Sequence, residues 1–185
     1  MDKPMRADAR RNYDRLLAEA KRAFTERGTD ASLEDIARSA GVGIGTLYRH
    51  FPSREALLEV LVRERFDAQA ERARELLAAP EPLAALRTWL GGLGDTAGAY
   101  SGLPERLTEA LSDETSELYA SCHAMQEAGS QLVERAKRVG ALRSDVTMQE
   151  LLLLLHAISS AGAHLPGDRG RVRLLDLVFE GLRPS

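Results

Sequence analysis

The sequence predicts an all-α protein of about nine helices. Long segments rich in Ala, Leu, Glu and Arg carry apolar residues three and four positions apart, which is the spacing of one helix face. No segment alternates polar and apolar residues with the period of two that a half-buried strand requires. Glycine and proline interrupt the helical pattern at intervals, and we expect helices to end at these residues.

The first predicted helix spans residues 7–26. One face of it is apolar, and this stripe consists of Tyr13, Leu16, Leu17, Ala20 and Phe24. Gly28 follows as a C-terminal stop. Ser32 is a candidate N-cap for a short second helix, with Asp35 three residues on in the capping-box position. Gly41 ends this second helix.

A third, short helix is predicted over Gly43–His50, and Pro52 stops it. Ser53 is placed to cap the fourth helix, which we expect to run from Arg54 to Leu77. The segment "APEP" at residues 79–82 is the clearest break in the helical pattern.

The second half of the chain predicts five more helices. They are a glycine-weakened helix over 83–100, a short helix over 103–111, a long helix over 113–139, and two further helices over 148–163 and 172–182. The helix over 148–163 contains the run Leu151–Leu155 and is apolar on almost every side. Such a helix is normally buried all round, so we expect a core helix or a subunit interface.

Charge is distributed unevenly along the chain. Residues 1–54 carry 11 Lys or Arg and 8 Asp or Glu, net +3, whereas residues 55–185 carry 14 and 20, net −6. A basic segment in an acidic chain is a hint of a local nucleic-acid footprint. An excess this small also arises from ordinary variation of solvated surface charge, so both interpretations stay open.

Composition argues against export and against membrane insertion. No apolar run approaches the roughly 18 residues of a membrane span, and the N-terminal segment is charged from Asp2 onward, unlike a secretory signal. The one cysteine, Cys122, has no partner for an internal disulfide. We therefore expect a cytoplasmic protein with no membrane association.

Residues 32–54 predict a helix-turn-helix, because two short helices joined by a tight glycine turn follow a longer bracing helix. In this motif the second helix enters the major groove, while the start of the first offers backbone amides to phosphate. Leu47 and Phe51 are four residues apart and are expected to face inward. Thr46, Arg49 and His50 then point largely outward, toward base edges and phosphates.

Three segments carry a specific family resemblance: "AFTERG", "SLEDIARSAGV" and "GTLYRHFPSREALL". With them, residues 16–61 resemble the DNA-binding domain of the tetracycline-repressor (TetR) family. The resemblance implies a DNA-binding domain over 1–54, a helical ligand-binding and dimerisation domain over 55–185, and a homodimeric repressor. It also implies a palindromic double-stranded DNA operator and release by a small-molecule effector, without any cofactor. A DNA-binding dimer that needs no effector is the alternative.

The resemblance also implies roles for single residues in DNA binding. Thr46 and Tyr48 match positions that touch backbone and base edges, and Arg54 matches a basic residue that grips phosphate. Arg6, Arg10 and Arg11 match a basic arm ahead of the first helix. The DNA-contacting positions so implied are Arg10, Ser32, Gly43, Ile44, Thr46, Tyr48, Arg49, His50 and Arg54.

The recognition helix departs from many relatives at its start, where Gly43 and Ile44 stand in place of Ser-Lys. Glycine is an acceptable N-cap, but the missing lysine predicts a shallower salt dependence of DNA binding. Ile44 has two interpretations. It is either a shoulder of the small core around Leu47 or a side chain that contacts a thymine methyl in the groove.

The resemblance places an effector pocket among the middle helices. Its candidate residues are Trp89, Leu93, Tyr100, Leu107, Tyr119, His123 and Met125. Trp89 and Leu93 are alternatively plain core, and Tyr119 and His123 are alternatively neighbours on a helix surface. Cys122 is either a small buried hydrophobe or a redox sensor.

The last two predicted helices are expected to form a four-helix bundle with their symmetry mates, as is usual in the family. The candidate interface residues are Leu152, Leu155, His156, Leu174, Leu175 and Val178. His156 and His164 share a helix face, but no carboxylate or cysteine accompanies them at metal-ligand spacing. The sequence contains none of the common phosphate-loop, hydrolase or dinucleotide motifs, so neither a metal site nor an enzyme is expected.

Overall fold

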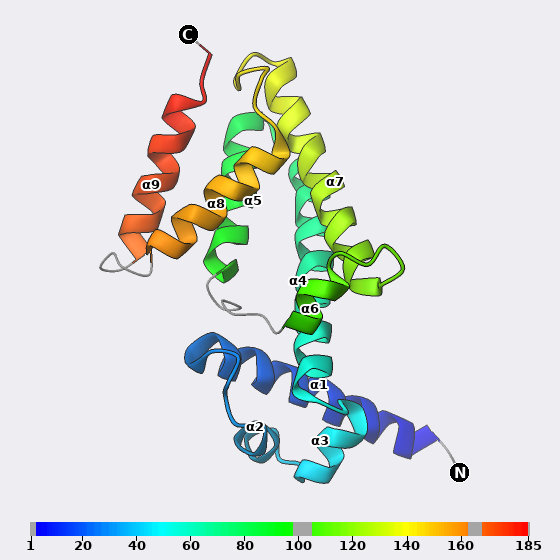
Figure 1. Ribbon diagram of the computed structural model, residues 1–185. Coiled ribbons are helices and arrows are strands. Elements are labelled where there is room, and N and C mark those ends of the chain that lie inside the picture. Colours follow the sequence, from blue (N-terminus) through cyan, green and yellow to red (C-terminus); the bar gives the residue numbers. More distant parts are fainter. Residues whose placement is uncertain (1–2, 98–104, 163–167, 185) are drawn as a thin grey trace. The chain divides into compact units, whose positions relative to one another are not determined.

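The computed structural model describes residues 3–97, 105–162 and 168–184, and every regular element within them is a helix (Figure 1). The all-α prediction is confirmed. In chain order the described helices are α1 (Lys3–Arg27), α2 (Leu33–Ser39), α3 (Ile44–His50), α4 (Arg54–Leu76), α5 (Pro82–Ala97), α6 (Glu105–Ala110), α7 (Glu117–Arg138), α8 (Met148–Gly162) and α9 (Asp168–Gly181). None of them combines the length and the apolar character that crossing a membrane requires.

The packing divides the chain into two compact units. The first comprises the described parts of residues 1–64 and 99–113, and the second those of 65–98 and 114–185. The division therefore falls inside α4, whereas the sequence places the domain boundary at the start of this helix. By its contacts α6 belongs to the first unit.

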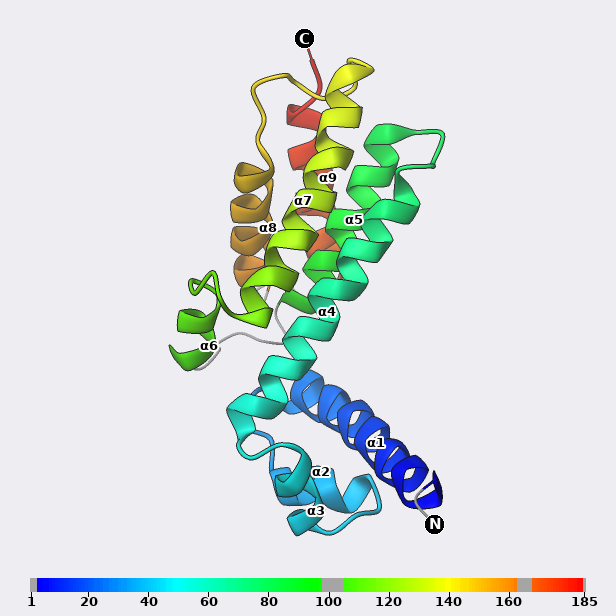
Figure 2. The ribbon, with the colours of Figure 1, turned by 90° about the vertical axis from the view of Figure 1, so that its right-hand side faces the viewer.

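The core of the first unit is built where α1 packs on α2 and α2 packs on α3 (Figure 2). The predicted apolar stripe of α1 forms part of this core, since Leu16 and Phe24 are fully buried. The other fully buried side chains from this part of the chain include Ile36, Leu47, Phe51, Leu57 and Leu58. Apolar burial of this kind is the main stabilising contribution in such a small unit.

The ends of α2 follow the predicted capping chemistry. The Asp35 amide donates to Ser32 Oγ over 3.3 Å, which confirms Ser32 as the N-cap. At the other end Gly41 has a φ of +69°, a conformation that glycine adopts without strain. There the amides of Gly41 and Val42 donate to carbonyls of the last helical turn, each over 3.0 Å, and so complete the helix end.

Three helices begin four residues away from the predicted start. α1 begins at Lys3 instead of Ala7, α7 at Glu117 instead of Asp113, and α9 at Asp168 instead of Val172. The start of α7 is fixed by Ser116, whose Oγ accepts a hydrogen bond from the Tyr119 amide over 2.9 Å.

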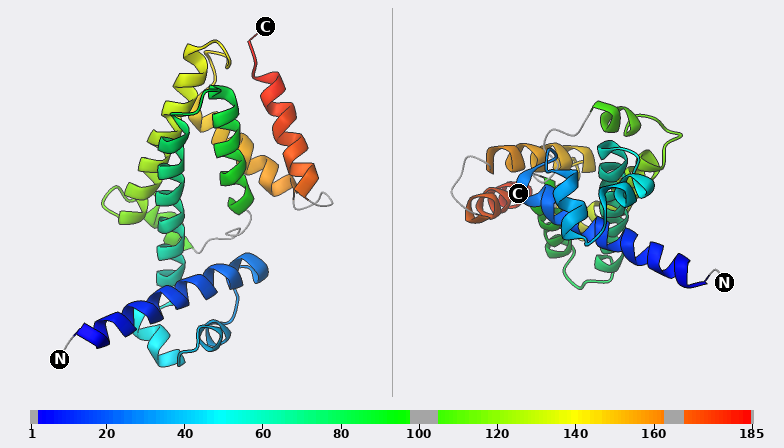
Figure 3. Two further views of the ribbon diagram at one scale, coloured as in Figure 1. Left: turned by 180° about the vertical axis from the view of Figure 1, so that it is seen from behind. Right: turned by 90° about the horizontal axis from the view of Figure 1, so that it is seen from below.

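In the second unit α5 packs on α7, α8 and α9, and α8 packs on α9 (Figures 1 and 3). Trp89 of α5 is 1% exposed at the centre of this core, and its Nε1 donates to the Gln69 carbonyl over 2.9 Å. Gly129 of α7 allows this close packing, because a Cβ there would lie 2.7 Å from Cζ3 of Trp89. Trp89 and Leu93 are core residues, which agrees with the plain-core interpretation.

Helix α8 is not buried all round within a single chain. Leu151, Leu155 and Ile158 are buried, but Leu153 is 64% exposed and Leu154 is 39% exposed. The apolar side chains of this helix therefore form two faces, one buried in the chain and one that the described residues leave partly exposed.

Candidate DNA-binding site

The projecting helix of the motif is α3, which Gly43 opens and Phe51 closes. Gly43 has extended backbone angles, φ −73° and ψ 151°, and as a glycine offers no side chain to cap the helix. Leu47 and Phe51 are 0% and 1% exposed, so they fix α3 to its support as the sequence predicts.

The opposite face of α3 is open. Ile44 is 36% exposed and Tyr48 is 48% exposed, and Arg49 is exposed beside them. Thr46 is half-buried, because it lies closer to the supporting side of the helix. The exposed face therefore presents one aliphatic, one aromatic and one cationic side chain, all of them suited to groove or phosphate contacts.

The side chain of His50 is less exposed than the sequence suggests. Its ring packs edge-on against Tyr13 of α1, with the ring centroids 5.8 Å apart, and Tyr13 stacks on Phe51 at 5.1 Å. His50 is half-buried as a result. The three rings join the end of α3 to α1, so His50 helps to set the direction in which α3 projects.

Arg54 has contacts within the chain that sequence reasoning missed. Its Nη1 donates to the carbonyl oxygens of Thr29 and Ala31 over 2.8 and 2.5 Å, in the loop between α1 and α2. A guanidinium held on two carbonyls braces this loop. A phosphate contact by Arg54 stays a prediction. Because Nη1 is held by the two carbonyls, Nε or Nη2 would have to donate to the phosphate.

The basic residues near the N-terminus do not form an arm ahead of the first helix, because α1 already begins at Lys3. Arg10 Nε lies 3.3 Å from Asp14 Oδ1, and Arg11 pairs with Asp8 one turn back. These pairs are exposed and i, i+3 or i, i+4 along one helix, so they are weak. Arg10 and Arg11 can therefore exchange their carboxylate partners for phosphate at little cost.

The start of α2 is less suited to binding phosphate than the sequence suggests. Ser32 is exposed, but its Oγ is already engaged by the Asp35 amide. Glu34 and Asp35 place negative charge in the first turn, and Asp35 pairs with Arg27 and Arg38. Like charge repels an approaching phosphate.

The candidate pocket residues belong to both units. Trp89, Leu93 and Met125 lie in the core cluster of the second unit, whereas Leu107 is buried in α6 of the first. Tyr100 lies outside the described residues.

Tyr119 and His123 are stacked neighbours on α7, with the ring centroids 6.0 Å apart, and His123 is exposed. This arrangement agrees with a pair on the helix surface. Cys122 between them is half-buried and accepts a hydrogen bond from Gln126. Burial raises the pKa of its thiol, which disfavours the thiolate that a redox sensor needs.

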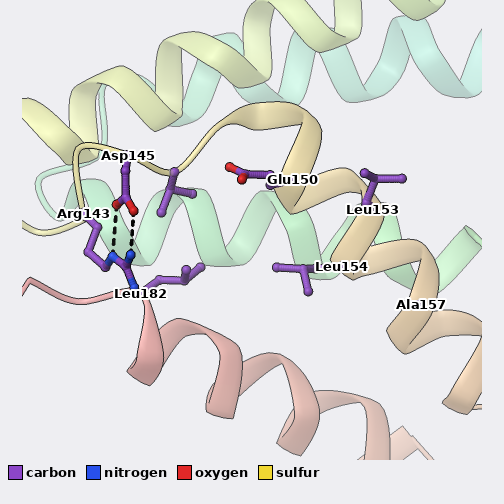
Figure 4. Close-up of a pocket in the computed structure, with 8 residues that line it drawn as sticks. Arg143, Asp145, Glu150, Leu153, Leu154, Ala157 and Leu182 are labelled. Carbon is purple, nitrogen blue, oxygen red and sulfur yellow. Dashed lines mark hydrogen bonds and ion pairs between the residues drawn. The ribbon is translucent and has the colours of Figure 1, made fainter.

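A groove of about 470 Å³ lies beside the exposed face of α8 (Figure 4). Arg143 and Asp145 pair at one end of it, through hydrogen bonds of 3.0 and 2.5 Å. The lining is otherwise mostly apolar and comprises Val146, Glu150, Leu153, Leu154, Ala157 and Leu182. Several of the exposed apolar side chains of the second unit thus gather around one depression.

The predicted dimer residues divide into two groups. Leu155 is 5% exposed and belongs to the core of its own chain, so it is not available to a partner. His156 is exposed, and the remaining residues are half-buried: Leu152, Leu174, Leu175 and Val178. The sequence missed the exposed apolar residues of α8 and α9, which are Leu153, Leu154, Val172 and Leu177. His164 lies outside the described residues, and no metal-binding cluster was found among the described ones.

A helix-turn-helix with an open recognition face, followed by a helical second unit, defines a DNA-binding protein of the helix-turn-helix class. Comparison with known proteins identifies the family. Residues 16–61 match the bacterial regulatory proteins of the tetR family, and residues 81–184 match the C-terminal domain of SbtR-like transcriptional regulators. The chain belongs to the TetR family of DNA-binding transcriptional regulators, a family of regulators and not of enzymes.

Solved structures of relatives extend over nearly the whole chain. The TetR transcriptional regulator SCO0520 from Streptomyces coelicolor is 39% identical, with a TM-score of 0.72 over 93% of this chain and 98% of that one. A TetR transcription regulatory protein from Mycobacterium vanbaalenii is 32% identical, with a TM-score of 0.67 over 98% and 100%. The HTH-type transcriptional repressor KstR2 of Mycolicibacterium smegmatis is 39% identical over 84 residues, which span 44% of this chain and only 40% of KstR2.

Proposed function

We propose that the protein is a homodimeric repressor that binds a palindromic operator and is released from it by a small-molecule effector. The observation that carries the proposal is the open face of α3, with Ile44, Tyr48 and Arg49 exposed above a buried Leu47 and Phe51. Because an operator is chromosomal DNA, the proposed site of action is the cytoplasm.

The exposed apolar face of α8 supports the homodimer. Leu153 and Leu154 border the groove of Figure 4, and Leu177 of α9 is 46% exposed. Exposed leucines on two helices that pack together are typical of an interaction surface. A second copy of the chain offers the same surface in reverse, as a twofold interface requires.

Two buried atoms of the second unit support an effector site. Among the described residues, Gln69 Oε1 and Ser159 Oγ are buried without a hydrogen-bond partner. Both side chains lie beside glycines of α5: a Cβ on Gly92 would lie 3.9 Å from Gln69 Nε2, and one on Gly94 would lie 3.9 Å from Ser159 Oγ. Unpartnered buried oxygens are costly, and a ligand with hydrogen-bond donors would satisfy them.

Proteins of the same fold are described with small molecules bound. RolR is described with resorcinol and FadR from Bacillus subtilis with stearoyl-CoA, at 16% and 18% identity and TM-scores of 0.58 and 0.62. These likenesses are of fold, so they support the presence of an effector and not its identity.

Selection of binding sequences from random duplex DNA with the full-length protein tests the proposal. We expect inverted repeats, with half-site centres about 34–36 Å apart or somewhat more. Footprinting on the DNA upstream of the protein's own gene then locates the operator. Failure to enrich any sequence would contradict the proposal.

A thermal-shift screen against a metabolite library separates the proposal from the effector-independent alternative. A compound that raises the melting temperature and lowers operator affinity supports release by an effector. Tight operator binding that no compound weakens favours a constitutive DNA-binding dimer.

A further inference from the structure

Ile44 is not part of the small core of the first unit. It stands at the first position of α3 and is 36% exposed, whereas Leu47, three residues later, is 0% exposed. An aliphatic side chain left open on the projecting helix of a DNA-binding motif calls for a partner outside the chain. The exposed part of Ile44 therefore favours the contact with a thymine methyl over the interpretation of Ile44 as a shoulder of the core.

The residues on either side of Ile44 make it prominent. Gly43 and Gly45 have no side chains, and a Cβ built on either would meet no atom of the described chain within 4 Å. The start of α3 is thus bare backbone with one aliphatic group. Side chains with donors or acceptors are absent from residues 43–45, so Ile44 is the one side chain that these three residues offer to a base.

Ile44 and Tyr48 lie one helical turn apart on the same exposed face. Gly45 and Arg49 form the neighbouring row, where the glycine leaves space beside Ile44 and the arginine is exposed. The outer face of α3 therefore changes along its length. It is apolar at the N-terminal end, and it carries a phenol and a guanidinium toward the C-terminal end.

The major groove offers one apolar group that suits such a side chain, which is the C5 methyl of thymine. Against guanine, cytosine or adenine, an isoleucine would cover donors or acceptors without satisfying them, and this is unfavourable. We propose that Ile44 reads a thymine in each half-site by contact with its C5 methyl, so that a T·A pair is required under the start of α3. The inference rests on the proposed function, because it specifies the bases that this site accepts.

Replacing thymine by deoxyuridine tests the proposal, since this removes the methyl and keeps the base pair. The duplex is the one selected with the full-length protein, and each thymine of a half-site is replaced in turn. One position should weaken binding about three- to fivefold, the loss that one buried methyl group produces. The Ile44→Ala variant should bind the thymine and the deoxyuridine duplexes equally.

Two further variants sharpen the experiment. Val139→Ala removes an equally aliphatic side chain that is 58% exposed outside the helix-turn-helix, and it should keep the full thymine preference. Ile44→Gln should shift the preferred base at this position toward adenine, because glutamine pairs with adenine edges. Ile44 is exposed, so these variants are expected to fold.

The outcomes separate the inference from the proposed function. Sequence-specific binding that is indifferent to every thymine methyl, or a thymine preference that survives Ile44→Ala, overturns the role of Ile44 alone. If the protein selects no DNA sequence at all, the proposed function itself fails.

Discussion

Arg54 shows at the residue scale how one side chain supports the DNA-binding unit from within. Its Nη1 donates to the carbonyls of Thr29 and Ala31, which joins the start of α4 to the loop between α1 and α2. Hydrogen bonds from a charged donor in a partly buried position stabilise more than neutral ones. Arg54 therefore braces the loop that leads into α2, and its predicted phosphate contact would be a second role for the same side chain.

We expect Arg54→Ala to lower the free energy of unfolding by about 1.5–3 kcal/mol, because two carbonyls lose a charged donor. Arg49→Ala is the matched control. It removes an exposed guanidinium from α3, so it should change stability by less than about 0.5 kcal/mol and still weaken operator binding. Urea unfolding followed by circular dichroism measures the first effect, and fluorescence anisotropy with operator DNA measures the second. An Arg54→Ala protein as stable as the wild type would contradict this assignment.

Sequence patterns located the recognition helix but not the surroundings of its side chains. Leu47 and Phe51 were predictable, because inward positions follow from four-residue spacing. The contact of His50 with Tyr13 was not, since it joins residues far apart in the chain and depends on how α1 and α3 pack. The internal hydrogen bonds of Arg54 have no sequence signature for the same reason.

At the scale of the helices, boundaries follow from caps where the sequence offers one good capping residue. Ser32 stands directly before the apolar pattern of α2, and Ser53 directly follows Pro52. In the structure each hydroxyl accepts a hydrogen bond from the amide three residues on. Before α7 the chain offers Asp113, Thr115 and Ser116, all acceptable caps, and the folded helix begins after Ser116. The start of α7 was therefore beyond sequence reasoning.

Packing between α5 and α7 depends on Gly129, where a Cβ would overlap the six-membered ring of Trp89. We expect Gly129→Ala to lower the free energy of unfolding by about 1–3 kcal/mol, because the added methyl overlaps a buried ring. Trp89 is the one tryptophan of the chain, so its fluorescence follows the unfolding of this unit selectively.

Gly91→Ala in α5 is the matched control for Gly129→Ala. A Cβ on Gly91 meets no described atom within 4 Å, so alanine should stabilise the helix by up to about 1 kcal/mol. If both alanine variants stabilised the protein equally, the close approach of α7 to Trp89 would be wrong.

At the scale of the whole molecule, the sequence predicted two parts that meet at residue 54. The first family match covers residues 16–61 and so extends past this boundary, and the second covers residues 81–184. The sequence could not divide the chain within α4, because an uninterrupted helical pattern runs through residues 54–76. Nor could the sequence distinguish the buried face of α8 from the exposed one, because residues 151–155 are all leucine and carry no polar pattern. Burial in the folded chain assigns Leu155 to the core and Leu153 to the surface.

The last prediction concerns the proposed dimer: we expect that substitutions on the exposed face of α8 disrupt the interface without unfolding the subunit. Leu153 and Leu154 are 64% and 39% exposed in the single chain, so charges placed there cost little within the subunit. In a twofold interface the same charges would face each other without water, which is strongly unfavourable.

We therefore expect the double variant Leu153→Glu, Leu154→Glu to be a folded monomer in analytical ultracentrifugation. It should keep the Trp89 fluorescence of the wild type and lose most of its affinity for a palindromic operator. Val139→Glu adds a charge at an equally exposed apolar residue outside α8 and α9 and should leave the dimer intact, whereas a double variant that remained dimeric would show that another surface joins the subunits.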